Sequence, residues 1–193
     1  MVIIHSDQLQ QKIHNFMQEN NITQLRKDPT ELYQKKIQQA VSKSSLLISK
    51  NQQKQVIQMK PNAPYLNVLI KTHKQNTPIR PVVNNRPVPA YRLAKFLNKS
   101  LNQMIKLPYT YALKNTLEIA LELSGPHISS QYRLVTFDIK DIYVKLPIQD
   151  IIKATNFWLH KFIVPHRLIQ QIILLINTVL SQNYFQKITC YAI

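Results

Sequence analysis

Apolar residues recur with helical spacing in the N-terminal part of the chain. Residues 7–24 carry apolar side chains three and four positions apart, a pattern that predicts an amphipathic helix. Residues 28–44 predict a second helix, with Asp28 as its cap and Pro29 at its first position. Residues 50–62 are polar and weakly patterned, so we expect the end of this second helix there, followed by a loop.

Proline shapes the next segment. Six prolines lie between residues 61 and 89, and they exclude a long helix. Two apolar runs, "YLNVLIKTHK" (65–74) and "TPIRPVVNN" (77–85), predict two strands joined by a polar turn at residues 75–77. Because Pro81 cannot donate a hydrogen bond to a neighbouring strand, we expect it at an edge of the sheet.

Helical spacing returns further along the chain. Residues 90–106 and 116–124 predict two helices, and residues 148–164 and 165–182 predict two more. Between these pairs, the apolar run at residues 133–138 predicts a buried strand. Helices and strands in this order are typical of an α+β fold.

The charge of the chain is strongly one-sided. It has 25 Lys and Arg residues against 9 Asp and Glu residues, a net charge of +16. Residues 32–117 contain fifteen Lys and Arg residues and no acid. Such a field indicates a polyanionic partner, with nucleic acid as the first candidate and an anionic membrane surface as the second. The membrane is the weaker candidate, because the basic residues alternate with strands and prolines and do not follow one long amphipathic helix.

Composition excludes several classes of protein. A single glycine, Gly125, leaves no glycine-rich phosphate loop, which excludes Walker-type and dinucleotide-fold nucleotide sites. A single cysteine, Cys190, excludes an internal disulfide and a cysteine zinc site, and it fits an intracellular, reducing compartment. No run reaches the ~18 apolar residues of a membrane span, and the N-terminus does not have the pattern of a signal peptide.

Two acids stand at the end of the predicted buried strand. In "RLVTFDIKDIYVKLP" (133–147), the apolar run stops at Asp138, and Asp141 follows three residues later. A carboxylate fixed at a strand end can hold a divalent cation for phosphoryl transfer, but an aspartate there can also simply end a strand or a turn. Tyr143 can lie under a nucleotide sugar, where it would obstruct a 2′-hydroxyl group, or it can be a core tyrosine. The local sequence leaves these alternatives open.

Basic residues on the predicted strand pair and the following helix form two further candidate sites. Lys71, Lys74 and Arg80 make a cationic fork that suits phosphate, and the alternative is a solvated basic hairpin that contacts nucleic-acid backbone without chemistry. Four more residues are expected to contact backbone phosphates: Arg86, Arg92, Lys95 and Lys99.

The order of these pieces resembles the fingers and early palm of the reverse transcriptases of the Penelope-like retroelement family. Four blocks of the sequence carry the resemblance, namely "KTHK" (71–74), "PIRPVV" (78–83), "YRLAK" (91–95) and "FDIKDIYVKLP" (137–147). The resemblance implies a partial right-hand polymerase fold with a basic fingers strand pair and a first palm strand followed by helices. A helical region (1–60) would precede a partial polymerase domain (61–193), with fingers at 61–130 and the start of a palm at 131–193.

The family resemblance also implies roles for single residues. Asp138 would be the first catalytic aspartate and would bind Mg²⁺ beside the backbone carbonyl of Ile139. A nucleotide-binding set would contact the incoming deoxynucleoside triphosphate or the template: Lys71, Lys74, Arg80 and Tyr143. The partners would be an RNA template, a DNA primer and the deoxynucleotides, and the expected location is the nucleus.

The chain also departs from the family pattern. Polymerases of this kind need a second aspartate pair, and no Asp or Glu follows Asp150. The rest of the palm, the thumb and the C-terminal nuclease portion of such a parent are missing. We therefore expect these 193 residues to be inactive alone. The alternative is a non-catalytic basic nucleic-acid-binding module, or the relic of a decayed element.

Overall fold

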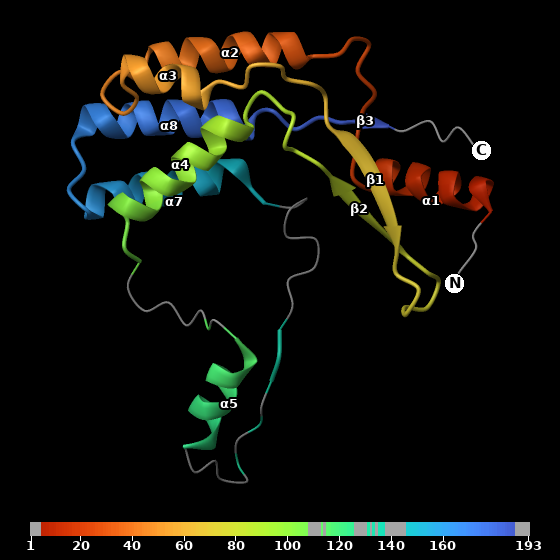
Figure 1. Cartoon of the computed structure of the whole chain (residues 1–193). Helices are drawn as coiled ribbons and strands as arrows, with labels where there is room; N and C mark the ends of the chain where they lie inside the picture. Colours follow the sequence, from red (N-terminus) through yellow and green to blue (C-terminus); the bar gives the residue numbers. More distant parts are fainter. Residues whose placement is uncertain are drawn as a thin grey trace.

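The computed structural model of the chain describes residues 5–107, 113, 115–125, 131, 133, 135–137 and 146–187. Helices and a small sheet make up these residues, which confirms the predicted α+β class (Figure 1). The helices are α1 (Ser6–Glu19), α2 (Thr30–Ser42), α3 (Lys50–Val56), α4 (Tyr91–Met104), α5 (Thr116–Ser124), α7 (Ile148–Lys161) and α8 (His166–Leu180). The strands are β1 (Tyr65–Ile70), β2 (Ile79–Val83) and β3 (Gln186–Lys187).

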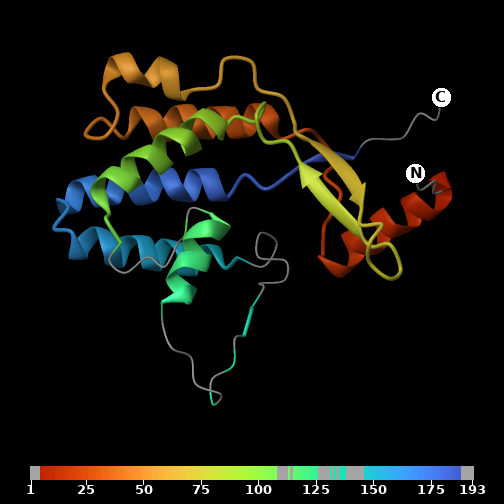
Figure 2. The ribbon, with the colours of Figure 1, turned by 60° about the horizontal axis from the view of Figure 1, so that its bottom comes forward.

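One hydrophobic core holds the main body together. Helix α8 contacts α2, α4 and α7, and α3 lies on α4 (Figures 1 and 2). Because the apolar residues of α8 recur at spacings of three and four, one side of this helix is buried. The core includes residues from both expected regions, 1–60 and 61–193. Its members on the four main helices are Ile37, Ala40, Val41, Leu93, Leu97, Leu159, Ile169, Ile172, Leu175 and Ile176.

The two N-terminal helices begin and end for local reasons. The Asp28 carboxylate accepts hydrogen bonds from the Thr30 backbone N–H at 2.9 Å and the Thr30 hydroxyl at 2.6 Å, as expected of a capping side chain. Helix α2 begins at Thr30, however, so Pro29 occupies the capping position and not the first helical one. Helix α1 ends at Glu19, five residues before the predicted end at residue 24. Asn21 has a φ of 52°, a left-handed conformation that stops the helix.

The prediction that residues 50–62 begin with the end of the preceding helix is wrong. Helix α2 stops at Ser42, and α3 is a separate helix that begins at Lys50. The Ser49 backbone N–H donates to Gln52 Oε1 at 3.1 Å, which gives α3 its own N-terminal cap. Ile48, fully buried in the core, fixes the connection between the two helices.

The sheet has the strand order β2-β1-β3. Strands β1 and β2 form the predicted antiparallel hairpin, and Pro81 lies on the edge strand β2 opposite Val68, as expected. Strand β3 adds to the other side of β1 in a parallel orientation. This pairing joins the end of the described chain to the hairpin.

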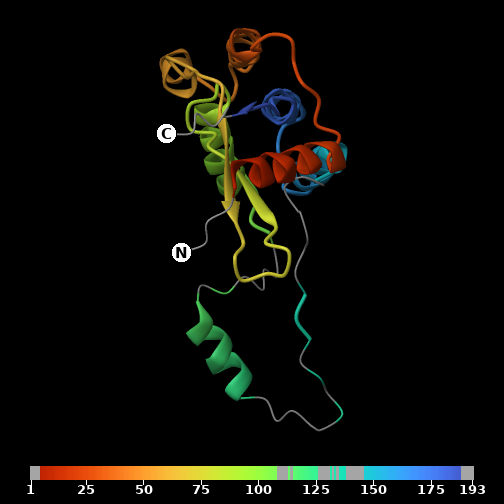
Figure 3. The ribbon, with the colours of Figure 1, turned by 90° about the vertical axis from the view of Figure 1, so that its right-hand side faces the viewer.

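The described part of residues 133–138 contradicts the predicted buried strand. Residues 135–137 belong to no strand, and the side chains of Val135 and Phe137 are 61% and 93% exposed. The reason is that no described strand or helix covers this apolar run, so it has no layer to bury against. The predicted helix α5 is present, but it buries no residue and lies apart from the helical bundle in Figures 1 and 3.

Among the helices that the structure describes, none combines the length and the apolar character that a bilayer crossing requires.

Candidate nucleic-acid interface

The hairpin has two different faces. Side chains along each strand alternate between buried or half-buried positions and exposed ones. Leu66, Val68 and Pro81 belong to the inner face, whereas Leu69 and Arg80 lie opposite one another on the outer face. The complete set of exposed residues on the two strands is Tyr65, Asn67, Leu69, Arg80 and Val82.

Lys71 and Arg80 come to the same face of the hairpin. The Lys71 backbone N–H donates to Pro78 O at 2.9 Å, so strand pairing continues one residue beyond Ile70. Lys71, which is half-buried, therefore continues the alternation that places Leu69 and Arg80 outward, and it is the diagonal neighbour of Arg80. Diagonal neighbours are about 7–8 Å apart, within reach of long side chains, so both cations can contact one phosphate group.

Lys74 lies at the tip of the hairpin. Its backbone N–H donates to Lys71 O at 3.2 Å, and its carbonyl accepts from the Thr77 N–H at 3.1 Å. Asn76 and Thr77 have left-handed backbone conformations, with φ values of 63° and 41°, which reverse the chain. The Lys74 side chain is exposed.

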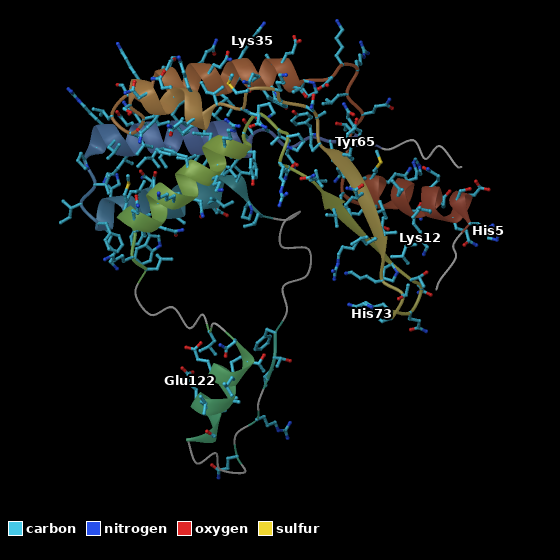
Figure 4. The ribbon with its side chains drawn as sticks, viewed as in Figure 1. His5, Lys12, Lys35, Tyr65, His73 and Glu122 are labelled. Carbon is cyan, nitrogen blue, oxygen red and sulfur yellow. The ribbon has the colours of Figure 1, made fainter. Side chains whose placement is uncertain are left out.

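Lys12 of α1 reaches the same tip. Its Nζ donates to the Asn76 carbonyl at 2.8 Å, which ties α1 to the turn (Figure 4). In Figure 4, Lys12 and His73 both lie near the end of the hairpin. Lys12 could not be predicted from the sequence, because 64 residues separate it from its partner and no local pattern connects them.

Helix α4 presents a second cationic surface. Leu93 and Leu97 face the core. Arg92, Lys95 and Lys99 are exposed, and their spacing of three and four residues puts them on one face of the helix. The side chain of Arg86, in the loop between β2 and α4, is also exposed. The structure thus exposes all four residues expected to contact backbone phosphates, on segments that directly follow the hairpin (Figure 3).

Among the described residues, no carboxylate forms an ion pair with the cations of the hairpin and α4. Within the residues that the structure describes, the ion pair is Lys153–Asp150, at 3.6 Å and well exposed. None of the seven expected cations pairs with a described carboxylate, so their positive charge is available to a ligand. Such a surface can hold phosphate groups by charge, and the exposed Tyr65 on the same hairpin can stack on a base.

The residues of the expected catalytic centre are not among those that the structure describes. Asp138, Ile139 and Tyr143 lie outside the described residues, as does Asp141. The described part of the chain brings no three His, Cys, Asp or Glu side chains together for a metal ion. By chemistry alone, a carboxylate and a backbone carbonyl are hard oxygen donors and suit Mg²⁺.

A chain of hydrogen bonds joins the start of α2 to the segment before β3; Thr30 and Tyr184 are buried, and Asp28 is exposed. Thr30 uses its hydroxyl hydrogen on Asp28, so the Tyr184 hydroxyl donates to Thr30 Oγ1, at 3.0 Å. Burial raises the pKa of the Tyr184 hydroxyl above its ordinary value of 10.0, and the negative charge of Asp28 acts in the same direction. The Tyr184 ring also packs on Tyr33, with 5.0 Å between ring centroids. These contacts hold β3 in place beside β1 and so support the hairpin.

Comparisons of this chain with protein-family models, with curated proteins and with solved structures found no match.

Proposed function

We propose that this chain binds nucleic acid through its hairpin and α4, as the fingers and first palm portion of a reverse transcriptase of the Penelope-like kind. The exposed cations of the hairpin and α4, without a described carboxylate partner, are the observation that carries the proposal. The four sequence blocks, present in the family's order, supply the support for the polymerase class.

The parent reaction would be template-directed addition of deoxynucleotides to a primer. Lys71, Lys74 and Arg80 would hold the triphosphate or the template, and Tyr143 would discriminate against a 2′-hydroxyl group. Asp138 and the Ile139 carbonyl would supply one side of a Mg²⁺ site. When bound, such ions stabilise the attacking and leaving oxygens of phosphoryl transfer.

Binding through the hairpin and α4 can be tested with a matched pair of variants. Arg80→Ala/Lys95→Ala/Lys99→Ala removes three cations from the proposed surface. Lys35→Ala/Lys50→Ala/Lys54→Ala removes three exposed cations from α2 and α3. Fluorescence anisotropy with a labelled RNA–DNA primer–template would measure both affinities across a salt series.

We expect the first variant to bind about tenfold more weakly or worse. The slope of log affinity against log salt should fall by about 1 for each lost phosphate contact. The control should keep an affinity close to that of the unsubstituted chain. Equal losses in the two variants would show that only total charge matters, and the proposed surface would then be wrong.

A second candidate function is a non-catalytic nucleic-acid-binding module. The exposed cations of the hairpin and α4 favour it, because binding to backbone phosphates by charge requires no metal site. The substitution Asp138→Ala separates the two functions. A binding module should bind primer–template as well as before or better without this negative charge. A polymerase portion should instead lose affinity in the presence of Mg²⁺ and a deoxynucleotide, but not in a chelator.

Activity itself is a separate test. We expect no primer extension by the purified chain, because one side of the metal site is missing from it. Magnesium-dependent extension that Asp138→Ala abolishes would contradict this expectation and would assign the complete reaction to these residues.

A further inference from the structure

A groove runs between helices α2 and α8. Two open hollows, of about 350 and about 500 Å³, adjoin there and share Lys43 and Leu174 in their linings. The helices are antiparallel, since residues late in α2 share a hollow with residues early in α8. The α8 side extends from Arg167 to Ser181, roughly 20 Å at 1.5 Å per residue.

Helical spacing puts the lining residues of each helix on one face. Lys36 lies on α2, and Lys43, directly after its last residue, is two helical turns further along. On α8 the lining recurs every three or four residues from Arg167 onward. Lys36 lies near one end of the groove, Lys43 near its middle and Arg167 near the other end. No carboxylate lines either hollow.

Hydrogen bonds within the groove determine which donors are available to bind a ligand. The Thr178 and Ser181 hydroxyls donate to the carbonyls of Leu174 and Thr178, so their hydrogens are already used. The remaining donors include the three cations, the exposed side-chain amides of Gln39 and Asn177, and Nε2 of Gln171, whose Oε1 accepts from the Leu46 N–H. A row of donors and positive charges without an acid suits a chain of phosphate oxygens.

We propose that the α2–α8 groove is a second binding track for the phosphate backbone of nucleic acid. No residue of the hairpin or α4 lines it, so it is distinct from the surface described above. In Figure 3, α4 lies to one side of both α2 and α8. The proposal rests on the proposed nucleic-acid binding and adds that this chain holds a long nucleic acid at two places.

An acidic peptide is the other macromolecule that a basic groove could take. Nucleic acid fits better because the cations are spread along the groove and amides lie between them, as regularly spaced phosphates require. The exposed side chains of Leu46 and Leu174 add apolar surface for sugars or bases.

The test uses Lys36→Ala/Lys43→Ala/Arg167→Ala, three exposed positions on helix surfaces. The control is Lys35→Ala/Lys50→Ala/Lys54→Ala, which removes the same charge and includes the direct neighbour of Lys36 (Figure 4 labels Lys35). Circular dichroism would verify that both variants fold. Anisotropy would be measured with RNA–DNA duplexes of roughly 10 and roughly 40 base pairs, about 34 and 136 Å long at 3.4 Å per base pair.

A ligand that contacts two sites at once binds more tightly than it would bind to either site alone. We therefore expect the groove variant to lose about tenfold in affinity for the long duplex, with a salt slope lower by about 2 to 3. Affinity for the short duplex should change by about twofold or less, since the hairpin and α4 still bind it. The control should keep the affinity of the unsubstituted chain for both.

Three results would overturn the inference. First, the groove variant could bind the long duplex as tightly as the control does, while Arg80→Ala/Lys95→Ala/Lys99→Ala still weakens binding. The proposed function would then be supported, and the proposed binding track in the groove would be wrong. Second, labelled poly-glutamate could bind the unsubstituted chain more tightly than the groove variant, while the duplex binds both equally. This result would assign the groove to an acidic peptide. If the unsubstituted chain bound no duplex at low salt, both proposals would fail.

Discussion

At the scale of single residues, a buried hydrogen bond between Tyr184 and Thr30 continues to the exposed carboxylate of Asp28. Tyr184 and Thr30 are 154 residues apart, and both are buried. Removing one partner of a buried hydrogen bond can destabilise the protein by more than the net contribution of that bond. The reason is that the remaining partner is buried away from water and has lost its hydrogen bond.

The substitution Tyr184→Phe tests this chain of hydrogen bonds. It keeps the ring against Tyr33 and removes only the hydroxyl, so we expect a loss of about 0.5–1.5 kcal/mol in the free energy of unfolding. Urea denaturation would measure it. Tyr91→Phe, at an exposed position, is the control and should change little. An unchanged stability in Tyr184→Phe would mean that the buried bond contributes nothing.

The raised pKa of Tyr184 predicts that the stability difference between the unsubstituted chain and Tyr184→Phe depends on pH. The folded chain holds the Tyr184 proton more tightly than the unfolded chain, since burial raises its pKa above 10.0. This contribution is complete below pH 10 and is lost as the pH rises through the raised value. The stability difference between the unsubstituted chain and Tyr184→Phe should therefore stay constant below about pH 10 and shrink as the pH rises further. A constant difference would contradict the raised pKa.

At the scale of elements, α4 connects the core to the candidate interface. One side of this helix buries Leu93 and Leu97, and the other side exposes Arg92, Lys95 and Lys99. Burial of the leucines against α8 therefore determines where the cations point. Local spacing in the sequence was enough to predict both sides, because a helix turns a spacing of three and four residues into a face.

Leu93→Ala should destabilise the molecule by about 2–5 kcal/mol, because it removes a fully buried side chain and leaves a cavity between α4 and α8. Thermal and urea unfolding would measure the change. Leu117→Ala on α5, where the side chain is 68% exposed, is the matched control and should stay within about 0.5 kcal/mol. Similar effects in the two variants would show that α4 does not depend on this packing.

At the scale of the whole molecule, strong positive charge and exposed apolar surface occur together. Helix α5 exposes Leu117 and Leu121, which are four residues apart on one face, and the described body leaves them uncovered. The net charge of +16 opposes association, whereas such a face favours it.

Leu117→Lys/Leu121→Lys should reduce self-association without loss of stability, since neither side chain contributes to the core. Light scattering would measure association, and urea unfolding should change by no more than about 0.5 kcal/mol. The control is Asn51→Lys/Gln55→Lys on α3, which adds the same charge at exposed positions and removes no leucine. If the control reduces association equally, charge and not the α5 face is responsible.

Only part of the candidate site could be predicted. The hairpin and its edge proline were predicted from the sequence, and the register of the two strands then placed Lys71 and Arg80 of the expected cationic fork on one face. The prediction of a buried strand at residues 133–138 was wrong for the described residues 135–137, because an apolar run is buried only if another layer exists to cover it. Lys12 escaped prediction because its contact with Asn76 depends on how α1 packs beside the hairpin.

The sequence alone determined what depends on near neighbours: the helix at residues 91–104, the hairpin, the Asp28 cap and the excess of positive charge. These properties come from side chains a few positions apart, or from composition. Only the tertiary structure decided the pairing of β3 with β1, the bond between Tyr184 and Thr30, and the groove between α2 and α8. Each joins segments far apart in the chain, and burial of the shared apolar core is what brings such segments together.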